Sequence, residues 1–417
     1  MAVGLTIGTI YLFLAVLCFQ LAKSSMQITK VFANTTVKES PVPVTTTYSV
    51  EKWAGTMFKI LANDSYTRYS LLDAPTLQLV EIERTNSVSA LIIRGCLLTD
   101  MPAVVNIPMV WKIEITFCRL RHLELGSLVN LRRLLVMKLN HNQITRIEPT
   151  AVPLRLQHFS LTNNNLSHLD AGVFAPMKEL FFLDLSFNQL VEIVSTNTSL
   201  PVLQMLSLSH NRLPMLNFVN WSMPQLKTLH CSSNRFTAPP AKWNSLPRLH
   251  VLDLSLNQLD TFPMDDLYLS ELGVLNLTGN TLTNVSTSKK RLLVPLKRLL
   301  LSSNRLTRLA VNRWNMPKLW DFSVAHNQLT ELGDVFHRFA TLHDRLDLRN
   351  NSWSCGWLLR VHPADLWQRD YGLLTTNASC SDRTLVFTDW KHPDREPHKI
   401  CCHEHERNWA LMRPPGG

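Results

Sequence analysis

The sequence lacks the features that mark enzymes, nucleic-acid-binding proteins and anchored membrane proteins. No catalytic motif is present, so a hydrolase or a metalloenzyme has no support, and we expect no catalytic residue and no cofactor. The formal charge of +10 is spread along the chain without a run of like charges and without an RNA- or DNA-binding motif, which argues against a nucleic-acid partner. No apolar run after residue 22 is long enough to cross a bilayer, so we expect no stable membrane anchor.

The chain begins with an apolar stretch, Val3 to Phe19, followed by the small residues Ala22 and Ser24. This pattern predicts a signal peptide at residues 1–24, and a retained anchor is the alternative because the basic start of a signal peptide is missing. Nine N-x-S/T sequons fit a secreted, extracellular glycoprotein. The asparagines that head them are Asn34, Asn63, Asn165, Asn197, Asn220, Asn276, Asn284, Asn350 and Asn377.

One eleven-residue stretch recurs along the chain, and its plainest copy runs from Leu203 to Leu213. Numbered 1 to 11, this copy has leucine at positions 1, 4, 6 and 11 and asparagine at position 9. The frame occurs twelve times at steps of 22 to 24 residues, which is the L-x-x-L-x-L-x-x-N/C-x-L signature of a leucine-rich repeat. Cys96 and Cys118 hold position 9 in the first two copies. Asparagine holds it in the others: Asn142, Asn164, Asn188, Asn211, Asn234, Asn257, Asn280, Asn304, Asn327 and Asn351.

The spacing of the leucines predicts the fold. Positions 4 and 6 alternate as in a β-strand, so their side chains point to one face of a sheet and those at positions 3, 5 and 7 to the other. The asparagine at position 9 follows the strand, where its amide can bond backbone groups of its own turn and of the neighbouring repeat. Each repeat buries its apolar side chains only when a neighbour covers it. We predict a curved α/β leucine-rich-repeat solenoid, a horseshoe with parallel strands on the concave face and irregular, 3₁₀ or short helical segments on the convex face.

The two ends of the array differ from its centre. Residues 25–87 show no readable frame and are predicted to form an N-terminal cap or linker without cysteine, in which Leu77 to Glu83 is a strand that covers the first repeat. The repeats are assigned to residues 88–353. Residues 354–410 are rich in tryptophan and cysteine and are predicted to form a disulfide-stapled C-terminal cap, with a helix within Gly356 to Asp370 and a tail at 411–417.

Four cysteines in the C-terminal cap predict two intrachain disulfides. Adjacent cysteines seldom pair because the bridge strains the peptide between them, so Cys401 and Cys402 should take different partners, Cys355 or Cys380, and the connectivity stays open. The stretch from Cys401 to Glu406, CCHEHE, contains zinc-ligand residue types but not the spacing of a zinc motif. Structural disulfides are therefore favoured over a metal site or a reactive thiol.

The array, the cysteine-free N-terminal cap and the adjacent Cys401 and Cys402 resemble the mosquito leucine-rich-repeat immune (LRIM) proteins. The resemblance covers about residues 88–402, and the double cysteine carries most of it. It implies a protein secreted into haemolymph, and a partner that is a complement-like thioester protein or another leucine-rich-repeat protein. Members that pair through a coiled coil continue beyond the double cysteine. Only fifteen residues follow it here, so the resemblance is to a coil-less type, and pairing through a coiled coil is in doubt.

Cys96 and Cys118 fall on neighbouring strands, with α-carbons expected roughly 5 Å apart, inside the range that a disulfide tolerates. Two reduced thiols in place of asparagine are the simpler interpretation. The alternative is a bridge that staples the N-terminal end of the array. Cys231 falls at position 6, where a buried thiol acts as a small apolar side chain.

Histidines on the concave face do not predict a metal site. His210, His230 and His250 fall on a diagonal whose members lie about 11 Å apart, too far for one zinc ion. They, and the isolated histidines at other concave positions, are interpreted as surface polar residues. Those others are His141, His158 and His326.

Apolar residues on the concave face form the candidate binding site. Positions 2, 3, 5, 7 and 8 should face solvent there, and in the second to sixth repeats apolar residues occupy positions 2, 3 and 8. A contiguous exposed apolar patch usually marks an interface. We call this set the concave patch: Trp111, Phe117, Leu135, Val136, Phe181, Phe182, Phe187 and Met205. Phe182 and Met205 share position 3 on neighbouring strands and should touch. A glycan or the N-terminal segment covering the patch is the alternative.

Two functions follow. The favoured one is a non-enzymatic, secreted binding protein of innate immunity that acts through protein–protein contacts on its concave and lateral surfaces. The alternative is direct recognition of a microbial glycan or lipid, or a general extracellular adhesion or receptor–ligand module.

Overall fold

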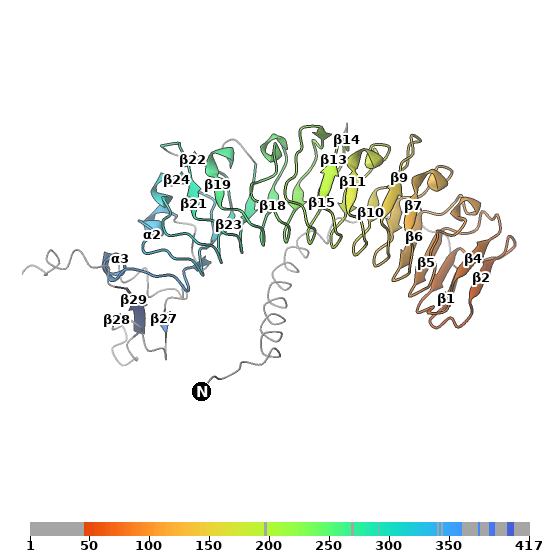
Figure 1. Ribbon diagram of the computed structural model, residues 1–417, viewed down its shortest axis with the longest axis horizontal. Coiled ribbons are helices and arrows are strands. Elements are labelled where there is room, and N and C mark those ends of the chain that lie inside the picture. The colour runs from red at the N-terminus through yellow and green to blue at the C-terminus, as the bar shows by residue number, and fades with distance from the viewer. Residues whose placement is uncertain are drawn as a thin grey trace, which may run out of the picture. The chain divides into compact units, whose positions relative to one another are not determined.

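A computed structural model describes residues 46–195, 198–267, 271–290, 292–339, 342, 345–360, 374–375, 383–387 and 398–403. From Thr47 the chain forms one compact unit built on a single sheet of fourteen parallel strands (Figure 1). The strands are stacked in chain order, one from each turn of the solenoid. They are β1 (Thr47–Val50), β3 (Arg68–Leu71), β5 (Ala90–Arg94), β6 (Lys112–Thr116), β8 (Val136–Lys138), β10 (His158–Ser160), β12 (Phe182–Asp184), β15 (Met205–Ser207), β17 (Thr228–His230), β18 (Val251–Asp253), β20 (Val274–Asn276), β23 (Arg298–Leu300), β25 (Asp321–Ser323) and β26 (Leu346–Asp347).

The leucine frame explains this sheet. In the repeat of β15, Leu203, Leu206, Leu208 and Leu213 (positions 1, 4, 6 and 11) are fully buried. The strands pair in register position by position, so the leucines of neighbouring repeats form continuous columns inside the solenoid. The predicted leucine-rich-repeat solenoid, with parallel strands on its concave face, is confirmed.

The outer side of the array consists of short pieces, as the sequence predicts. The described residues include six 3₁₀ turns: η1 (Val104–Asn106), η2 (Leu125–Leu128), η3 (Ala171–Phe174), η4 (Trp243–Ser245), η5 (Met264–Leu267) and η6 (Val311–Arg313). A four-residue helix, α2 (Val335–Arg338), follows. Pairs of short parallel strands complete this side: β2 (Met57–Ile60) with β4 (Leu79–Ile82), β7 (His122–Glu124) with β9 (Arg146–Glu148), β11 (His168–Asp170) with β13 (Glu192–Val194), β14 (Thr198–Ser199) with β16 (Trp221–Ser222), β19 (Thr261–Pro263) with β21 (Asn284–Ser286), and β22 (Leu292–Leu293) with β24 (Trp314–Asn315).

The N-terminal boundary of the array differs from the prediction. β1 and β3 extend the sheet by two turns before residue 88, so much of the predicted cap at 25–87 is solenoid. The strand expected within Leu77 to Glu83 exists as β4, but it pairs with β2 on the outer side instead of covering the first repeat. The frame is hidden in these turns because Trp53 and Ala74 occupy position 9, where neither asparagine nor cysteine marks it.

The C-terminal cap contains a helix and a small sheet. The helix α3 (Cys355–Arg360) begins one residue before the predicted segment, Gly356 to Asp370, and residues 361–370 of that segment lie outside the described residues. Three antiparallel strands, β27 (Leu374–Thr375), β28 (Arg383–Phe387) and β29 (His398–Cys402), form a sheet that the sequence did not predict. The indole N–H groups of Trp353 and Trp357 donate to the carbonyls of Leu348 and Gly333, which ties α3 to the last turns of the array. Among the described residues, no helix is long and apolar enough to cross a membrane.

Candidate functional site

The centre of the concave patch is a row of side chains at position 3 of neighbouring strands. Strand register places Val136, His158, Phe182 and Met205 side by side on β8, β10, β12 and β15. The neighbours Phe182 and Met205 are thus register partners, as predicted. All four side chains are half-buried, because their strands shield one side of each and the concave face leaves the other open.

Aromatic stacking joins the patch to its histidines. The imidazole of His158 lies on the ring of Phe182, with centroids 4.1 Å apart and an angle of 12° between the rings. His141 lies in the same way on Phe117, and His210 on Phe187, each at 4.0 Å. The interpretation of these histidines as isolated polar residues is therefore wrong, because each shares its repeat position with a phenylalanine on the adjoining repeat.

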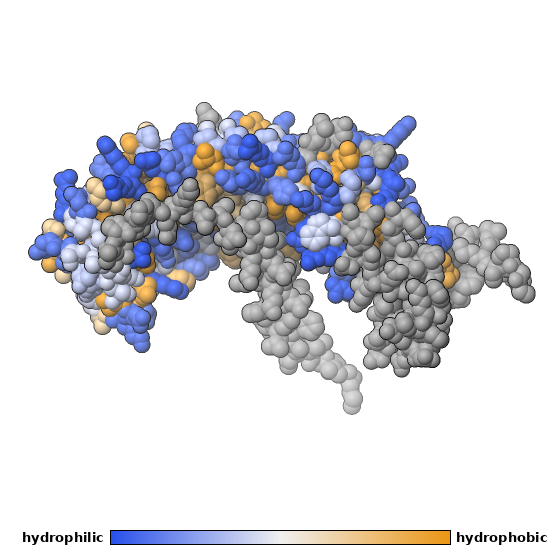
Figure 2. Space-filling model, turned by 180° about the vertical axis from the view of Figure 1, so that it is seen from behind, coloured by the Kyte–Doolittle hydropathy of each residue, from blue (hydrophilic) through white to orange (hydrophobic). Residues whose placement is uncertain are grey.

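The remaining members of the patch flank this row. At position 2, Trp111 is exposed, while Leu135 and Phe181 are half-buried. At position 8, Phe117 and Phe187 are 46% and 47% exposed. Figure 2 shows apolar surface of this array in separate areas between polar side chains. The structure thus leaves every predicted patch residue partly open on the concave side.

The row at position 3 is uncharged at neutral pH. Burial, with a smaller contribution from the nearby Lys138 ammonium, lowers the pKa of His158 to about 4, against an opposing effect of Asp184. Burial also lowers the pKa of His210. Neutral imidazoles stacked on phenylalanine rings extend the apolar surface instead of interrupting it with charge.

The asparagines at position 9 hold the strands that carry the patch. The Nδ2 of Asn142 donates to the carbonyls of Leu139 in its own repeat (3.0 Å) and of Ile115 in the preceding one (2.8 Å). Its Oδ1 accepts from the N–H of Leu120, also in the preceding repeat, at 3.2 Å. The pattern recurs at each asparagine through Asn351. The predicted bonding of each asparagine to its own turn and to the adjacent repeat is confirmed.

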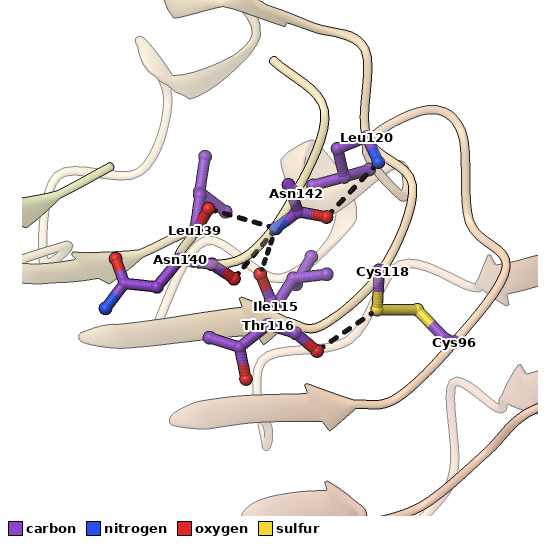
Figure 3. Close-up of a disulfide and its surroundings, with 8 residues drawn as sticks. All are labelled: Cys96, Ile115, Thr116, Cys118, Leu120, Leu139, Asn140 and Asn142. Carbon is purple, nitrogen blue, oxygen red and sulfur yellow. Dashed lines mark hydrogen bonds between the residues drawn. A yellow bond between two sulfur atoms is a disulfide. The ribbon is translucent and has the colours of Figure 1, made fainter. Parts of the chain in front are cut away.

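The column of asparagines at position 9 starts beside a disulfide. Cys96 and Cys118 are bridged, with α-carbons 4.5 Å apart (Figure 3). The favoured interpretation of two reduced thiols is wrong, and the alternative bridge is the observed state. The sulfur of Cys118 lies 3.4 Å from the carbonyl oxygen of Thr116, a contact without a hydrogen because the sulfur is oxidised. The bridge therefore stands where two asparagines would otherwise continue the column.

The other cysteines lie as the sequence predicts, within the described residues. Cys355 pairs with Cys402, with α-carbons 5.0 Å apart. Cys401 is also disulfide-bonded, and Cys380 lies outside the described residues. The adjacent cysteines thus do not pair with each other. Cys231 is a buried free thiol, and burial raises its pKa.

The sequons fall on several sides of the array. Asn63, Asn165, Asn220, Asn284 and Asn350 are exposed. Asn276 is half-buried at position 5 of β20, on the concave face. Asn34, Asn197 and Asn377 lie outside the described residues, as do the signal peptide and the tail.

No group of three or more histidine, cysteine or acidic side chains that could hold a metal occurs in the part of the chain that the structure describes. The diagonal of His210, His230 and His250 brings no such group together. The backbone N–H of Cys355 donates to the carbonyl of His403. The remaining residues of the CCHEHE stretch, 404–406, lie outside the described part.

Sequence reasoning missed two exposed apolar residues on the same face. Leu256, at position 8 of the eighth repeat, is 45% exposed, and Trp320, at position 2 of the eleventh, is 39% exposed. The guanidinium groups of Arg298 and Arg345 lie 5.9 and 5.0 Å from the Trp320 ring centroid. Both residues stand in the repeat frame, so comparing solvent-facing positions across all twelve repeats would have found them.

Comparisons with known proteins agree with the fold. A family model described as leucine rich repeat matches residues 154–190. No curated protein matches the chain. Among solved structures, the APL1 leucine-rich repeat domain is 23% identical with a TM-score of 0.60, over 83% of this chain and 88% of that domain. The leucine-rich repeat domain of APL1B is 22% identical with a TM-score of 0.56, over 77% and 88%.

A chain of the LRIM1/APL1C complex is 23% identical with a TM-score of 0.61. The alignment covers 84% of this chain and spans 62% of the length of that chain. At these identities the likeness establishes the solenoid fold.

Proposed function

We propose that this chain is a secreted, non-enzymatic binding protein of innate immunity that holds a protein partner on the concave patch. The observation that carries the proposal is the row of Val136, His158, Phe182 and Met205, which is contiguous, apolar and open on one side. Their neighbours at position 4, which point to the opposite face of the sheet, are fully buried, so the solenoid does not need these side chains for its core. An exposed apolar patch of this kind usually marks an interface.

The partner class is a protein. The leucine-rich-repeat fold commonly serves protein–protein interaction, and the structurally similar LRIM1 and APL1C form a complex with each other. The partner proposed here is another leucine-rich-repeat protein or a complement-like thioester protein. The disulfides Cys96–Cys118 and Cys355–Cys402 fit an oxidising, extracellular setting.

Direct recognition of a microbial glycan or lipid is the second candidate. The observation that favours it is exposed aromatic surface, Trp111, Phe117 and Phe187, which can stack on the apolar faces of sugar rings. A capture experiment separates the two functions. Tagged full-length protein is incubated in parallel with mosquito haemolymph and with purified bacterial cell wall. Recovery of a thioester or leucine-rich-repeat protein supports the first function, whereas retention on cell wall alone supports the second.

A further inference from the structure

Position 8 of the repeat has an unusual backbone. Thirteen consecutive turns, from Asp73 to Asn350, have a positive φ there, between 51° and 70°. This left-handed conformation suits glycine, asparagine and, to a lesser degree, histidine, and it is unfavourable for large apolar side chains. Ten of the thirteen turns carry glycine or a polar residue there. The other three carry the large apolar side chains Phe117, Phe187 and Leu256.

These three side chains, which we call the apolar row, share one arrangement. Each is 45–47% exposed. Each also lies over position 8 of the following repeat. Phe117 stacks on His141 and Phe187 on His210, with rings within 10° of parallel. Leu256 covers Gly279, where a β-carbon would come within 2.6 Å of a leucine methyl carbon. Position 8 of the following repeat therefore packs against one side of each side chain in the apolar row, and the other side stays exposed to solvent.

The spacing of the apolar row is regular. Phe117, Phe187 and Leu256 belong to the second, fifth and eighth repeats, so each is three strands from the next. At about 4.8 Å per strand, the interval is about 14 Å. An extended chain rises about 3.3 Å per residue, so four residues span about 13 Å and return to the same face. A helix would need between nine and ten residues, which is not a whole number of turns.

The charge at positions 8 and 10 of the repeats has one sign. Positions 8 and 10 of the twelve repeats contain no aspartate or glutamate, whereas position 10 contains four exposed arginines. Two of them, Arg212 and Arg235, stand in the two repeats between Phe187 and Leu256. The other two are Arg119 and Arg305.

The carboxylates on the strands that precede Phe187 and Leu256 already accept hydrogen bonds. Asp184 accepts a hydrogen bond from the hydroxyl of Ser186 at 2.6 Å, and Asp253 accepts one from that of Ser255 at 2.7 Å. An anionic partner therefore meets arginines along the row without facing acidic side chains at positions 8 and 10.

We propose that the apolar row binds an extended, acidic polypeptide segment with an apolar side chain at every fourth residue. The apolar side chains would pack against Phe117, Phe187 and Leu256, and carboxylates between the last two would meet Arg212 and Arg235. Unfavourable backbone conformations persist where the surrounding structure holds them, and they concentrate at functional sites. The inference deepens the proposed function, because it specifies a protein ligand for one edge of the concave face.

The probe is a fluorescein-labelled peptide with three leucines, each four residues from the next, glutamates between them, and threonine and valine elsewhere to favour an extended chain. Fluorescence anisotropy with the full chain should show binding that weakens as salt rises. Phe187→Asn and Leu256→Asn should each weaken binding at least fivefold. Because asparagine tolerates the left-handed backbone, both variants should melt at or above the parent temperature. Ser303→Asn, at position 8 of the tenth repeat and outside the span from Phe117 to Leu256, is the matched control and should bind as the parent does.

Several outcomes would overturn the inference. One is absence of peptide binding by the parent chain, and another is equal binding by the parent and the two row variants. A third is equal binding of a peptide of the same composition with its leucines three residues apart. Self-association of the chain that Phe187→Asn abolishes, without peptide binding, would make a second copy the occupant. None of these outcomes bears on whether the chain captures a haemolymph protein through Phe182. Failure of the peptide inference and failure of the proposed function are therefore distinguishable.

One sequon lies at position 8 or 10 within the span from Phe117 to Leu256. Asn165, at position 10 of the fourth repeat, is exposed between Phe117 and Phe187. The interval from Phe187 to Leu256 has no sequon at position 8 or 10. The assay is therefore run on the parent and on Asn165→Gln, and the effect of Leu256→Asn should be the same in both backgrounds.

Discussion

The side-chain amide of Asn257 donates to the carbonyl oxygen of Cys231, in the preceding repeat, at 3.0 Å. It also donates to Leu254 in its own repeat, and its oxygen accepts from the N–H of Phe236. One buried side chain thus satisfies backbone groups of two repeats. Because a solenoid repeat contacts only its neighbours, such links hold the concave strands in register.

Asn257→Ala should lower the free energy of unfolding by about 1–3 kcal/mol, because it leaves buried backbone groups without partners. Chemical denaturation checks this. The matched control is Gln258→Ala, which removes an exposed side chain at the next position and should leave the midpoint unchanged. Equal midpoints for the two variants would mean that the asparagine bonds contribute nothing to stability.

The Cys96–Cys118 bridge closes a loop with a sequence separation of 22 residues. In the chain-entropy account, such a bridge contributes roughly 3 kcal/mol. The double variant Cys96→Ser, Cys118→Ser should therefore unfold at lower denaturant. Alkylation of the unfolded, unreduced protein should label Cys231, the buried free thiol, and neither bridged cysteine. Labelling of both Cys96 and Cys118 would contradict the bridge.

Non-reducing peptide mapping should recover Cys355 linked to Cys402. Cys401 should appear in a second linked peptide, for which Cys380 is the predicted partner. The adjacent pair cannot close on itself when Cys402 is bonded to Cys355. A peptide containing a Cys401–Cys402 bridge, or a link between two chains at either position, would refute this connectivity.

His158 should make the protein less stable in mild acid. Its pKa falls from the ordinary value near 6.5 to about 4 in the folded chain, mainly through burial. Between these values the unfolded chain binds a proton that the folded chain does not, so stability is highest above pH 6.5 and falls as the pH drops toward 4. His158→Gln should lose less stability than the parent between pH 7 and pH 5.

Thermal unfolding at several pH values measures this difference. His168→Gln, on the outer strand β11, is the control for loss of a histidine outside the concave face. If His158→Gln and the parent lose the same stability over this range, burial does not hold His158 neutral in the folded chain.

The repeat frame made most of the fold predictable, because the strand, the turn and the ladder residue each recur at a fixed position. The frame failed where its marker was missing. Trp53 and Ala74 hold position 9 in the first two turns, so nothing in the pattern separated those turns from a linker. The small sheet of the C-terminal cap had no repeating pattern, and its strands pair across distant segments that sequence spacing does not relate.

The candidate site was predicted at the level of residues and not of contacts. Alternation along a strand indicates which side chains face outward, and it correctly placed Phe182 beside Met205. The stack of His158 on Phe182 required comparison of the same position in neighbouring repeats. The left-handed backbone at position 8 gave a signal in its glycines and asparagines, but the large residues among them, such as Leu256, concealed it.

The central claim, that the concave patch binds a protein, is tested most directly by Phe182→Glu. This change places a charge in the middle of the half-buried row at position 3 and leaves the buried leucines of the core unchanged. Val274→Glu is the matched control, since Val274 occupies position 3 of β20, is half-buried on the same face and lies outside the patch.

The measurement is the amount of partner captured from haemolymph by each tagged variant, together with its melting temperature. The account predicts that Phe182→Glu loses most of the captured partner, that Val274→Glu retains it, and that both melt close to the parent. Equal capture by Phe182→Glu and the parent, at equal melting temperature, would contradict a binding role for the patch.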